Sequence, residues 1–81
     1  MKDLLDIRNE IDGIDRQIVE LFENRMILTT QVAEYKISTG KAVFDKEREV
    51  SKLDSVAELA HSEFNSHGVR ELFEHIMSVS R

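Results

Sequence analysis

The sequence predicts an all-α protein, in which one long helix and two shorter helices pair with a second copy to form an intertwined homodimeric helical bundle. Apolar residues recur at spacings of three and four in three successive segments, which is the helical period. Proline is absent and only three glycines are present, so few positions interrupt these segments. No segment alternates apolar and polar residues as a strand does. The 81 residues have room for one domain, predicted to span residues 1–81.

The first predicted helix runs from about Leu4 to Ile37. Its apolar residues follow a spacing close to 3.5 residues, which is typical of a helix packed in coiled-coil fashion. We call this series the seam; it comprises Leu4, Ile7, Ile11, Ile14, Ile18, Leu21, Leu28, Val32 and Tyr35. Gly13 lies inside the helix at a cost of roughly 1 kcal/mol relative to alanine. The long apolar register outweighs that cost.

The other two helices are predicted from shorter series. "STGKAVF", residues 38–44, is a predicted loop, and Asp45 is a predicted N-cap with "KERE" in the first turn. The second helix is expected to continue through Phe64, after which "NSHG" (residues 65–68) breaks it. The third helix is expected from Val69 to the end of the chain. Its apolar face comprises Val69, Leu72, Phe73, Ile76 and Met77.

The length of the first helix predicts the dimer. About 34 residues extend roughly 50 Å at 1.5 Å per residue. Two helices of about 15 to 20 residues are too short to cover such a rod, and an exposed apolar seam would be a large adhesive patch. We therefore expect the long helix to pack against its counterpart in a second chain.

Composition excludes several classes of function. The formal net charge of −5 argues against nucleic acid as a partner, because phosphate binding needs a basic surface. The absence of cysteine excludes disulfides and thiolate metal sites and suits a reducing compartment. No signal-peptide pattern and no segment long enough to span a bilayer is found, so a cytoplasmic location is expected. The three histidines have no i, i+4 pairing, so neither a metal nor a cofactor is predicted.

Arg25 occupies a seam position between Leu21 and Leu28. A snorkelling side chain or a residue that sets the register of a dimer would explain it. Lys36 lies 11 residues further on, which places both cations on one helix face with Cα atoms roughly 16 Å apart. Lys36 alone is explained by a favourable position near a helix C-terminus. Together the two cations predict a site for a small dianion.

Four more residues are candidates for such a site. Arg8 is about 25 Å from Arg25 and rotated by about 100°, so the two cannot share a small ligand within one chain. In an antiparallel dimer, Arg8 of one chain could reach the Arg25 region of the other. Arg48 and Glu49 open the second helix, and Ser80 lies on the apolar face of the third. Solvated helix ends are the ordinary alternative for all four. No Ser-His-Asp or Cys-His set and no phosphate-binding loop is present, so the pattern predicts anion binding without a nucleophile.

Three motifs resemble those of the all-helical chorismate mutases, and the resemblance covers nearly the whole chain. "LLDIRNEIDGIDRQIVELFENRMILTTQVAEYK" resembles the long first helix of that family, with an arginine in its middle. "VFDKERE" is similar to the Asp-x-x-Arg-Glu motif that opens the family's second helix, and "ELFEHIMSVS" is similar to its third helix. The motifs occur in the family's order and at close to its spacing, which makes the resemblance specific.

The resemblance implies a chorismate mutase, which rearranges chorismate to prephenate on the way to phenylalanine and tyrosine. It implies a substrate-binding pocket formed by Arg8, Arg25, Lys36, Asp45, Arg48, Glu49 and Ser80, with the cations and Glu49 as the catalytic residues. Arg8 would enter from the other subunit, and Lys36 would also donate to the ether oxygen of the breaking bond. Glu49 would accept from the ring hydroxyl with help from the backbone at Asp45, and Ser80 would hydrogen-bond a carboxylate.

The sequence departs from the family's pattern at two positions and leaves three alternatives; the lesser departure is that the family's frequent proline in the first loop is absent. The family usually places Gln or Glu four residues after this serine, at what would be position 84, so no residue before Arg81 is assigned that role. An isochorismate-pyruvate lyase shares the fold and a similar cation set. A non-catalytic module would bind chorismate or prephenate beside a fused or associated domain of the shikimate pathway. A plain helical dimer without ligand is the third alternative.

Overall fold

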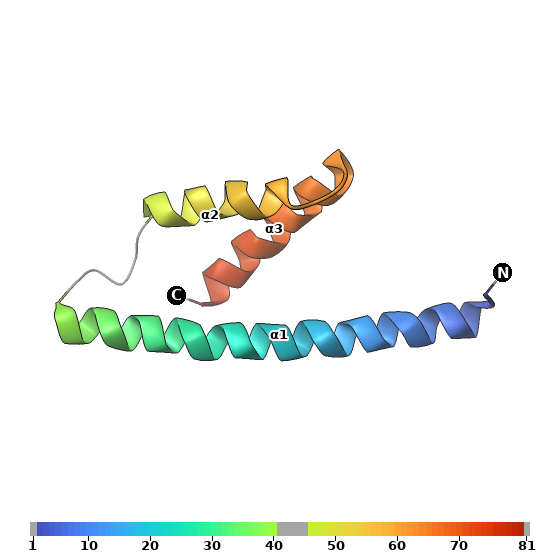
Figure 1. The fold of residues 1–81 in the computed structure, drawn as a ribbon, viewed down its shortest axis with the longest axis horizontal. Helices are drawn as coiled ribbons and strands as arrows, with labels where there is room; N and C mark the ends of the chain where they lie inside the picture. The colour runs from blue at the N-terminus through green and yellow to red at the C-terminus, as the bar shows by residue number, and fades with distance from the viewer. Residues whose placement is uncertain (1, 41–45, 81) are drawn as a thin grey trace. The chain divides into compact units, whose positions relative to one another are not determined.

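The computed structural model describes residues 2–40 and 46–80, and within these ranges all regular structure is helical (Figure 1). The helices are α1 (Leu4–Thr39), α2 (Lys46–Glu58) and α3 (Glu63–Val79). The predicted class, with one long helix followed by two shorter ones, is confirmed. By their internal contacts the residues form two units, Met1–Tyr35 and Lys36–Arg81. The first unit holds most of α1, and the second holds the end of α1 together with α2 and α3.

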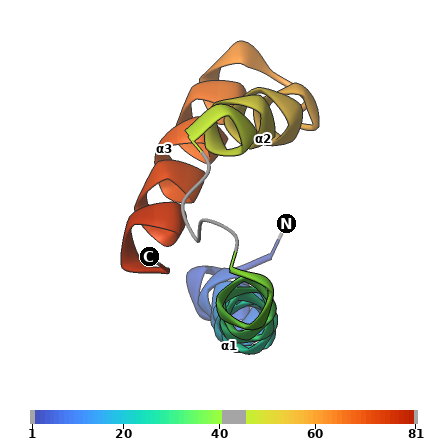
Figure 2. The same cartoon turned by 90° about the vertical axis from the view of Figure 1, so that its left-hand side faces the viewer.

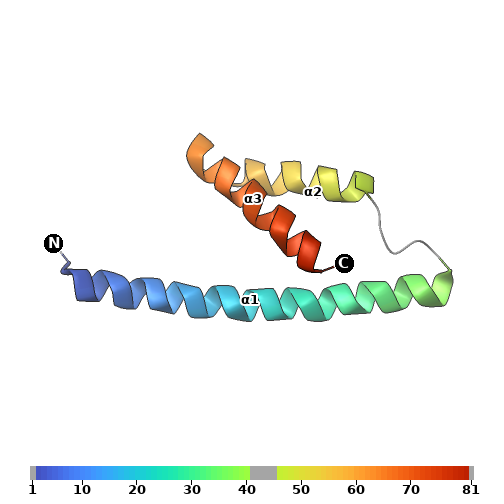
Figure 3. The same cartoon turned by 180° about the vertical axis from the view of Figure 1, so that it is seen from behind.

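Local interactions at residues 3 and 40 define the start and the end of helix α1. The side chain of Asp3 accepts a hydrogen bond from the Asp6 N–H at 2.9 Å, which satisfies one amide of the first turn. After Thr39, Gly40 adopts a φ of 75°, the left-handed conformation that commonly ends a helix. Figures 1 and 3 show one continuous helix between these ends. The prediction of a helix from Leu4 to Ile37 is therefore confirmed to within two residues.

The seam of α1 remains open to solvent in the single chain. No residue of α1 is buried. Exposure of the seam side chains ranges from 42% at Ile7 to 67% at Leu21. A long helix of this kind gains little from its own chain, since most helical stability in proteins comes from packing of the apolar face.

Helices α2 and α3 form a hairpin whose arms lie side by side (Figure 2). Its core is small: among the residues that the structure describes, Val56 and Ala57 from α2 and Met77 from α3 are the buried ones. Polar contacts also bridge the helices. Arg70 Nη2 lies 2.7 Å from Asp54 Oδ1, and Ser66 Oγ donates to the Ala57 carbonyl at 2.9 Å. The second contact holds the start of α3 against the end of α2.

The predicted boundary between the second and third helices is wrong. Helix α2 ends at Glu58, six residues before the expected Phe64, and the "NSHG" segment lies inside α3. The break is made by Ser62, whose extended backbone (φ −147°, ψ 157°) and side chain cap α3 by accepting from the Asn65 N–H. Phe64 is 88% exposed, so it does not continue the buried face of α2. The predicted N-cap Asp45 lies outside the described residues.

None of the helices in the described part of the chain is both long enough and apolar enough to cross a membrane.

Candidate active site

Helix α1 presents two cations on one strip of its surface. Because α1 is unbroken from Leu4 to Thr39, Arg25 and Lys36 differ by about 20° around the axis and by roughly 16 Å along it. Both residues are half-buried, although most of α1 is exposed. Lys36 lies in the last turn, where the partial negative charge of the helix C-terminus favours a cation. The spacing predicted from the sequence therefore holds.

Thr29 lies on the same strip but is not among the site residues predicted from the sequence. It is half-buried, four residues after Arg25 and seven before Lys36. Its hydroxyl donates to the Arg25 carbonyl at 2.9 Å. A helical wheel places Thr29 on this strip, so the signal was available in the spacing.

Arg8 lies near the other end of α1 and is exposed. It is about 25 Å from Arg25 along the axis and is rotated by about 100°. These two arginines of one chain therefore cannot bind the same small ligand. This geometry agrees with the prediction that Arg8 serves a different chain, which stays a prediction.

The first turn of α2 holds the next pair. Arg48 is exposed and Glu49 is half-buried. Glu47 and Glu49 are the acidic residues of this turn, where the helix dipole favours negative charge. The pair is thus positioned by the helix start, as predicted, whereas Asp45 lies outside the described residues.

Ser80 is the C-cap of α3 and is half-buried. Its hydroxyl donates to the Ile76 carbonyl at 2.6 Å, and its N–H donates to the Met77 carbonyl at 3.2 Å. The hydroxyl therefore satisfies a carbonyl at the helix end, where carbonyls lack their usual amide partners.

The predicted site residues are divided between the two units. Arg8 and Arg25 belong to the first unit, and the second unit holds Lys36, Arg48, Glu49 and Ser80. Their convergence on one ligand stays a prediction.

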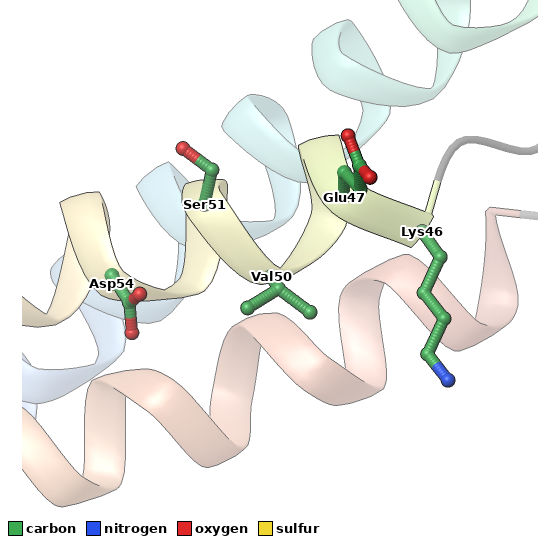
Figure 4. A pocket seen from close by; sticks show the side chains of 5 residues that line it. All are labelled: Lys46, Glu47, Val50, Ser51 and Asp54. Atoms are coloured by element: carbon green, nitrogen blue, oxygen red, sulfur yellow. The ribbon is translucent and has the colours of Figure 1, made fainter.

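A hollow beside α2 does not coincide with these residues. It is lined by Lys46, Glu47, Val50, Ser51 and Asp54 (Figure 4). Its lining carries two carboxylates and one ammonium group, so the hollow is unsuited to a dianion. Among the described residues, no group of three or more side chains is arranged to hold a metal ion. The candidate chemistry therefore rests on the cations, on Glu49 and on hydroxyl groups.

Comparison with known proteins identifies the family. Residues 7–81 match the family model described as chorismate mutase type II. The T-protein of Haemophilus influenzae is 38% identical over 55 residues, which cover 68% of this chain and 15% of that protein. The bifunctional chorismate mutase/prephenate dehydratase of Buchnera aphidicola subsp. Schizaphis graminum is 35% identical over 79 residues, which cover 96% of this chain and 20% of that protein. The chain thus spans a fifth or less of the length of these relatives.

A solved structure agrees with the fold. The chorismate mutase (form I) from Thermus thermophilus aligns with a TM-score of 0.92 over 99% of this chain and 100% of that one, at 24% identity. This likeness confirms the all-helical fold. The match to the family model extends over almost the whole sequence, and the chain therefore belongs to the chorismate mutase type II family.

Proposed function

We propose that this chain binds chorismate and catalyses its rearrangement to prephenate, a step in the formation of phenylalanine and tyrosine. One observation supports this most directly. A chain of the chorismate mutase type II family carries two half-buried cations, Arg25 and Lys36, on one strip of its long helix. Such a pair suits a small substrate with two carboxylates, although the chain as a whole is acidic.

In the proposed site the arginines and Lys36 have different roles. Arg25, Arg48 and the partner subunit's Arg8 bind the two carboxylates, because the planar guanidinium pairs bidentately with a carboxylate. Lys36 acts as a point charge and donates to the ether oxygen. Glu49 accepts from the ring hydroxyl, with help from the backbone at Asp45.

Ser80 contributes a further hydrogen bond to a carboxylate in this proposal. To do so, its hydroxyl turns away from the Ile76 carbonyl, to which it donates in this structure. Because donation to a carboxylate is charge-assisted, it is stronger than donation to a neutral carbonyl.

The reaction requires neither a nucleophile nor a proton transfer. One C–O bond breaks while one C–C bond forms within a single molecule. The protein therefore has two tasks. It holds the flexible enolpyruvyl arm over the ring, which removes the entropic cost of reaching that geometry. It also stabilises the negative charge that develops on the ether oxygen, and in this proposal the Lys36 ammonium is the donor that does so.

We also propose that the active form is a homodimer. The seam of α1 leaves a long row of apolar side chains at least 42% exposed, and single soluble chains rarely expose patches of that extent. A second α1 packed antiparallel would cover the seam. It would also bring its Arg8 toward the Arg25 region, which Arg8 of the same chain cannot reach.

A neighbouring enzyme domain is part of the proposal. The relatives named as bifunctional combine a chorismate mutase with a prephenate dehydratase, and this chain matches 20% of the one from subsp. Schizaphis graminum. We propose a fused or associated domain of the same pathway, acting in the cytoplasm, a reducing compartment that suits a chain without cysteine.

The test is a direct assay of the 81-residue chain with chorismate. Loss of ultraviolet absorbance is followed, and prephenate is identified after acid conversion to phenylpyruvate. We expect turnover by the wild type and a loss of about 100-fold or more in kcat/KM for Arg25→Ala and for Lys36→Ala. The matched control is Arg16→Ala, because Arg16 is exposed and lies about 180° around α1 from Arg25.

The same assay separates the alternatives. Release of pyruvate from isochorismate without action on chorismate would identify a lyase. Binding of prephenate without turnover of either substrate would identify a non-catalytic module. Equal activity of Arg25→Ala and Arg16→Ala would refute the assigned site.

A further inference from the structure

Two adjacent threonines of α1 make the same backbone contact but lie on different faces. Thr29 Oγ1 donates to the Arg25 carbonyl at 2.9 Å, and Thr30 Oγ1 donates to the Met26 carbonyl at 3.0 Å. Thr29 is half-buried, whereas Thr30 is exposed. The hydrogen bond to the helix backbone is therefore common to both threonines, and they differ in the helix face on which they lie.

The position of Thr29 points to the candidate site. It is about 40° around the axis from Arg25 and about 20° from Lys36, at roughly 6 Å and 10 Å along α1. Between the two cations, only Thr29 and Val32 lie within about 40° of Arg25. Thr29 is the one of the two that carries a hydrogen-bonding group. Thr30 lies about 100° further around and faces away.

The hydroxyl proton of Thr29 can be redirected at little cost. In an α-helix the N–H of residue 29 already donates to the carbonyl of residue 25, so the hydroxyl adds a second hydrogen bond to an acceptor that is satisfied. Ser80 differs in this respect, since its own N–H donates to Met77 and its hydroxyl occupies the Ile76 carbonyl. Thr29 is thus the more readily recruited of the two hydroxyls.

We propose that Thr29 is a further substrate-binding residue, whose hydroxyl donates to a carboxylate of the dianion held between Arg25 and Lys36. The inference rests on the proposed function and deepens it. A hydroxyl that donates to a carboxylate forms a charge-assisted hydrogen bond, which adds direction to the attraction of the two cations. The contact therefore fixes the orientation of the substrate along the strip.

Paired substitutions test the inference. Thr29→Val keeps the shape and removes the hydroxyl, Thr29→Ser keeps the hydroxyl, and Thr30→Val is the matched control. We expect Thr29→Val to lower kcat/KM by roughly 10- to 100-fold, the effect of losing a hydrogen bond to a charged group. Thr29→Ser and Thr30→Val are expected to stay close to wild type. Thermal unfolding of Thr29→Val and Thr30→Val should shift equally, because each loses the same kind of backbone contact.

Two results would overturn the inference, and they are distinguishable. If the wild type turns over chorismate and Thr29→Val matches Thr30→Val, the role of Thr29 is refuted and the proposed function stands. If the wild type neither binds nor converts chorismate, the proposed function and the role of Thr29 fail together.

Discussion

Arg25 combines two demands on a single position. It occupies the seam, where its neighbours in register, Leu21 and Leu28, are apolar. When a seam is covered by a partner, an uncompensated charge within it costs several kcal/mol. In the proposed site a bound dianion would compensate the guanidinium, and the long aliphatic stem would still pack among the apolar residues. If the seam also forms a wall of the binding site, the presence of Arg25 in an otherwise apolar series is explained.

Met77 shows how few residues stabilise the α2–α3 hairpin. It is one of three buried side chains there, with 7% of its surface exposed. We expect Met77→Ala to lower the free energy of unfolding by about 2–5 kcal/mol, since it leaves a cavity in a small core. The control Leu59→Ala removes a side chain that is 76% exposed, so its expected effect is within about 0.5 kcal/mol. Urea unfolding at a fixed protein concentration measures both, and equal effects would contradict this account of the core.

At the scale of the helices, local sequence signals determine the extent of α1, whereas the boundary between α2 and α3 also depends on contacts between the two helices. Helix α1 follows from its own sequence, because three local signals indicate the same helix. The apolar register runs along it, the Asp3 side chain caps its start, and Gly40 ends it. The α2–α3 boundary depends on contacts as well as on local signals. Ser62 caps α3, and Ser66 bonds the Ala57 carbonyl across the turn. Sequence periodicity does not detect the second contact.

The two glycines predicted to interrupt the helices should respond in opposite ways to alanine. Gly68 lies inside α3 with open space around the position of an added Cβ. Gly68→Ala should therefore stabilise the chain by about 0.5–1 kcal/mol. Gly40 has a φ of 75°, so Gly40→Ala should destabilise it by about 1–2 kcal/mol. Thermal unfolding of the two variants at matched concentration measures the difference; a loss of stability in Gly68→Ala would contradict the assignment of "NSHG" to α3.

At the scale of the whole molecule, the proposed dimer makes the site a shared one. Each site would use Arg25 of one subunit and Arg8 of the other, which predicts a result that no single-chain site can produce. Arg8→Ala and Arg25→Ala homodimers should each be nearly inactive. In a mixed dimer, one of the two sites regains both arginines while the other loses both.

Complementation between inactive variants therefore measures the dimer and the role of Arg8 together. After Arg8→Ala and Arg25→Ala are unfolded, mixed in equal amounts and refolded, about a quarter of wild-type activity should return, because half of the dimers are mixed and each has one intact site. The matched control mixes Arg25→Ala with Lys36→Ala. In the proposed dimer both of these residues would belong to the same chain's site, so no activity should return. Equal recovery in the two mixtures would contradict a site that uses Arg8 from the partner.

The predictions from sequence succeeded where the determinants are close together along the chain. The existence and extent of α1 and the spacing of Arg25 and Lys36 follow from a single helical period. The family follows from three motifs in order, and the match over residues 7–81 confirms it. Thr29 was missed because it breaks no apolar pattern. Its helix face and its half-buried state distinguish it from Thr30, which makes the same kind of backbone contact.

The sequence by itself determined the helical class, the long helix and the order of the charged residues on it, because each depends on neighbours within a few turns. Only the tertiary structure decided where α2 ends and α3 begins. The apolar spacing continues from Ala57 through Ala60 and Phe64, so periodicity alone favours a longer second helix. The chain instead turns at Ser62, because the cap and the packing of α3 against α2 stabilise a hairpin more than further helix would.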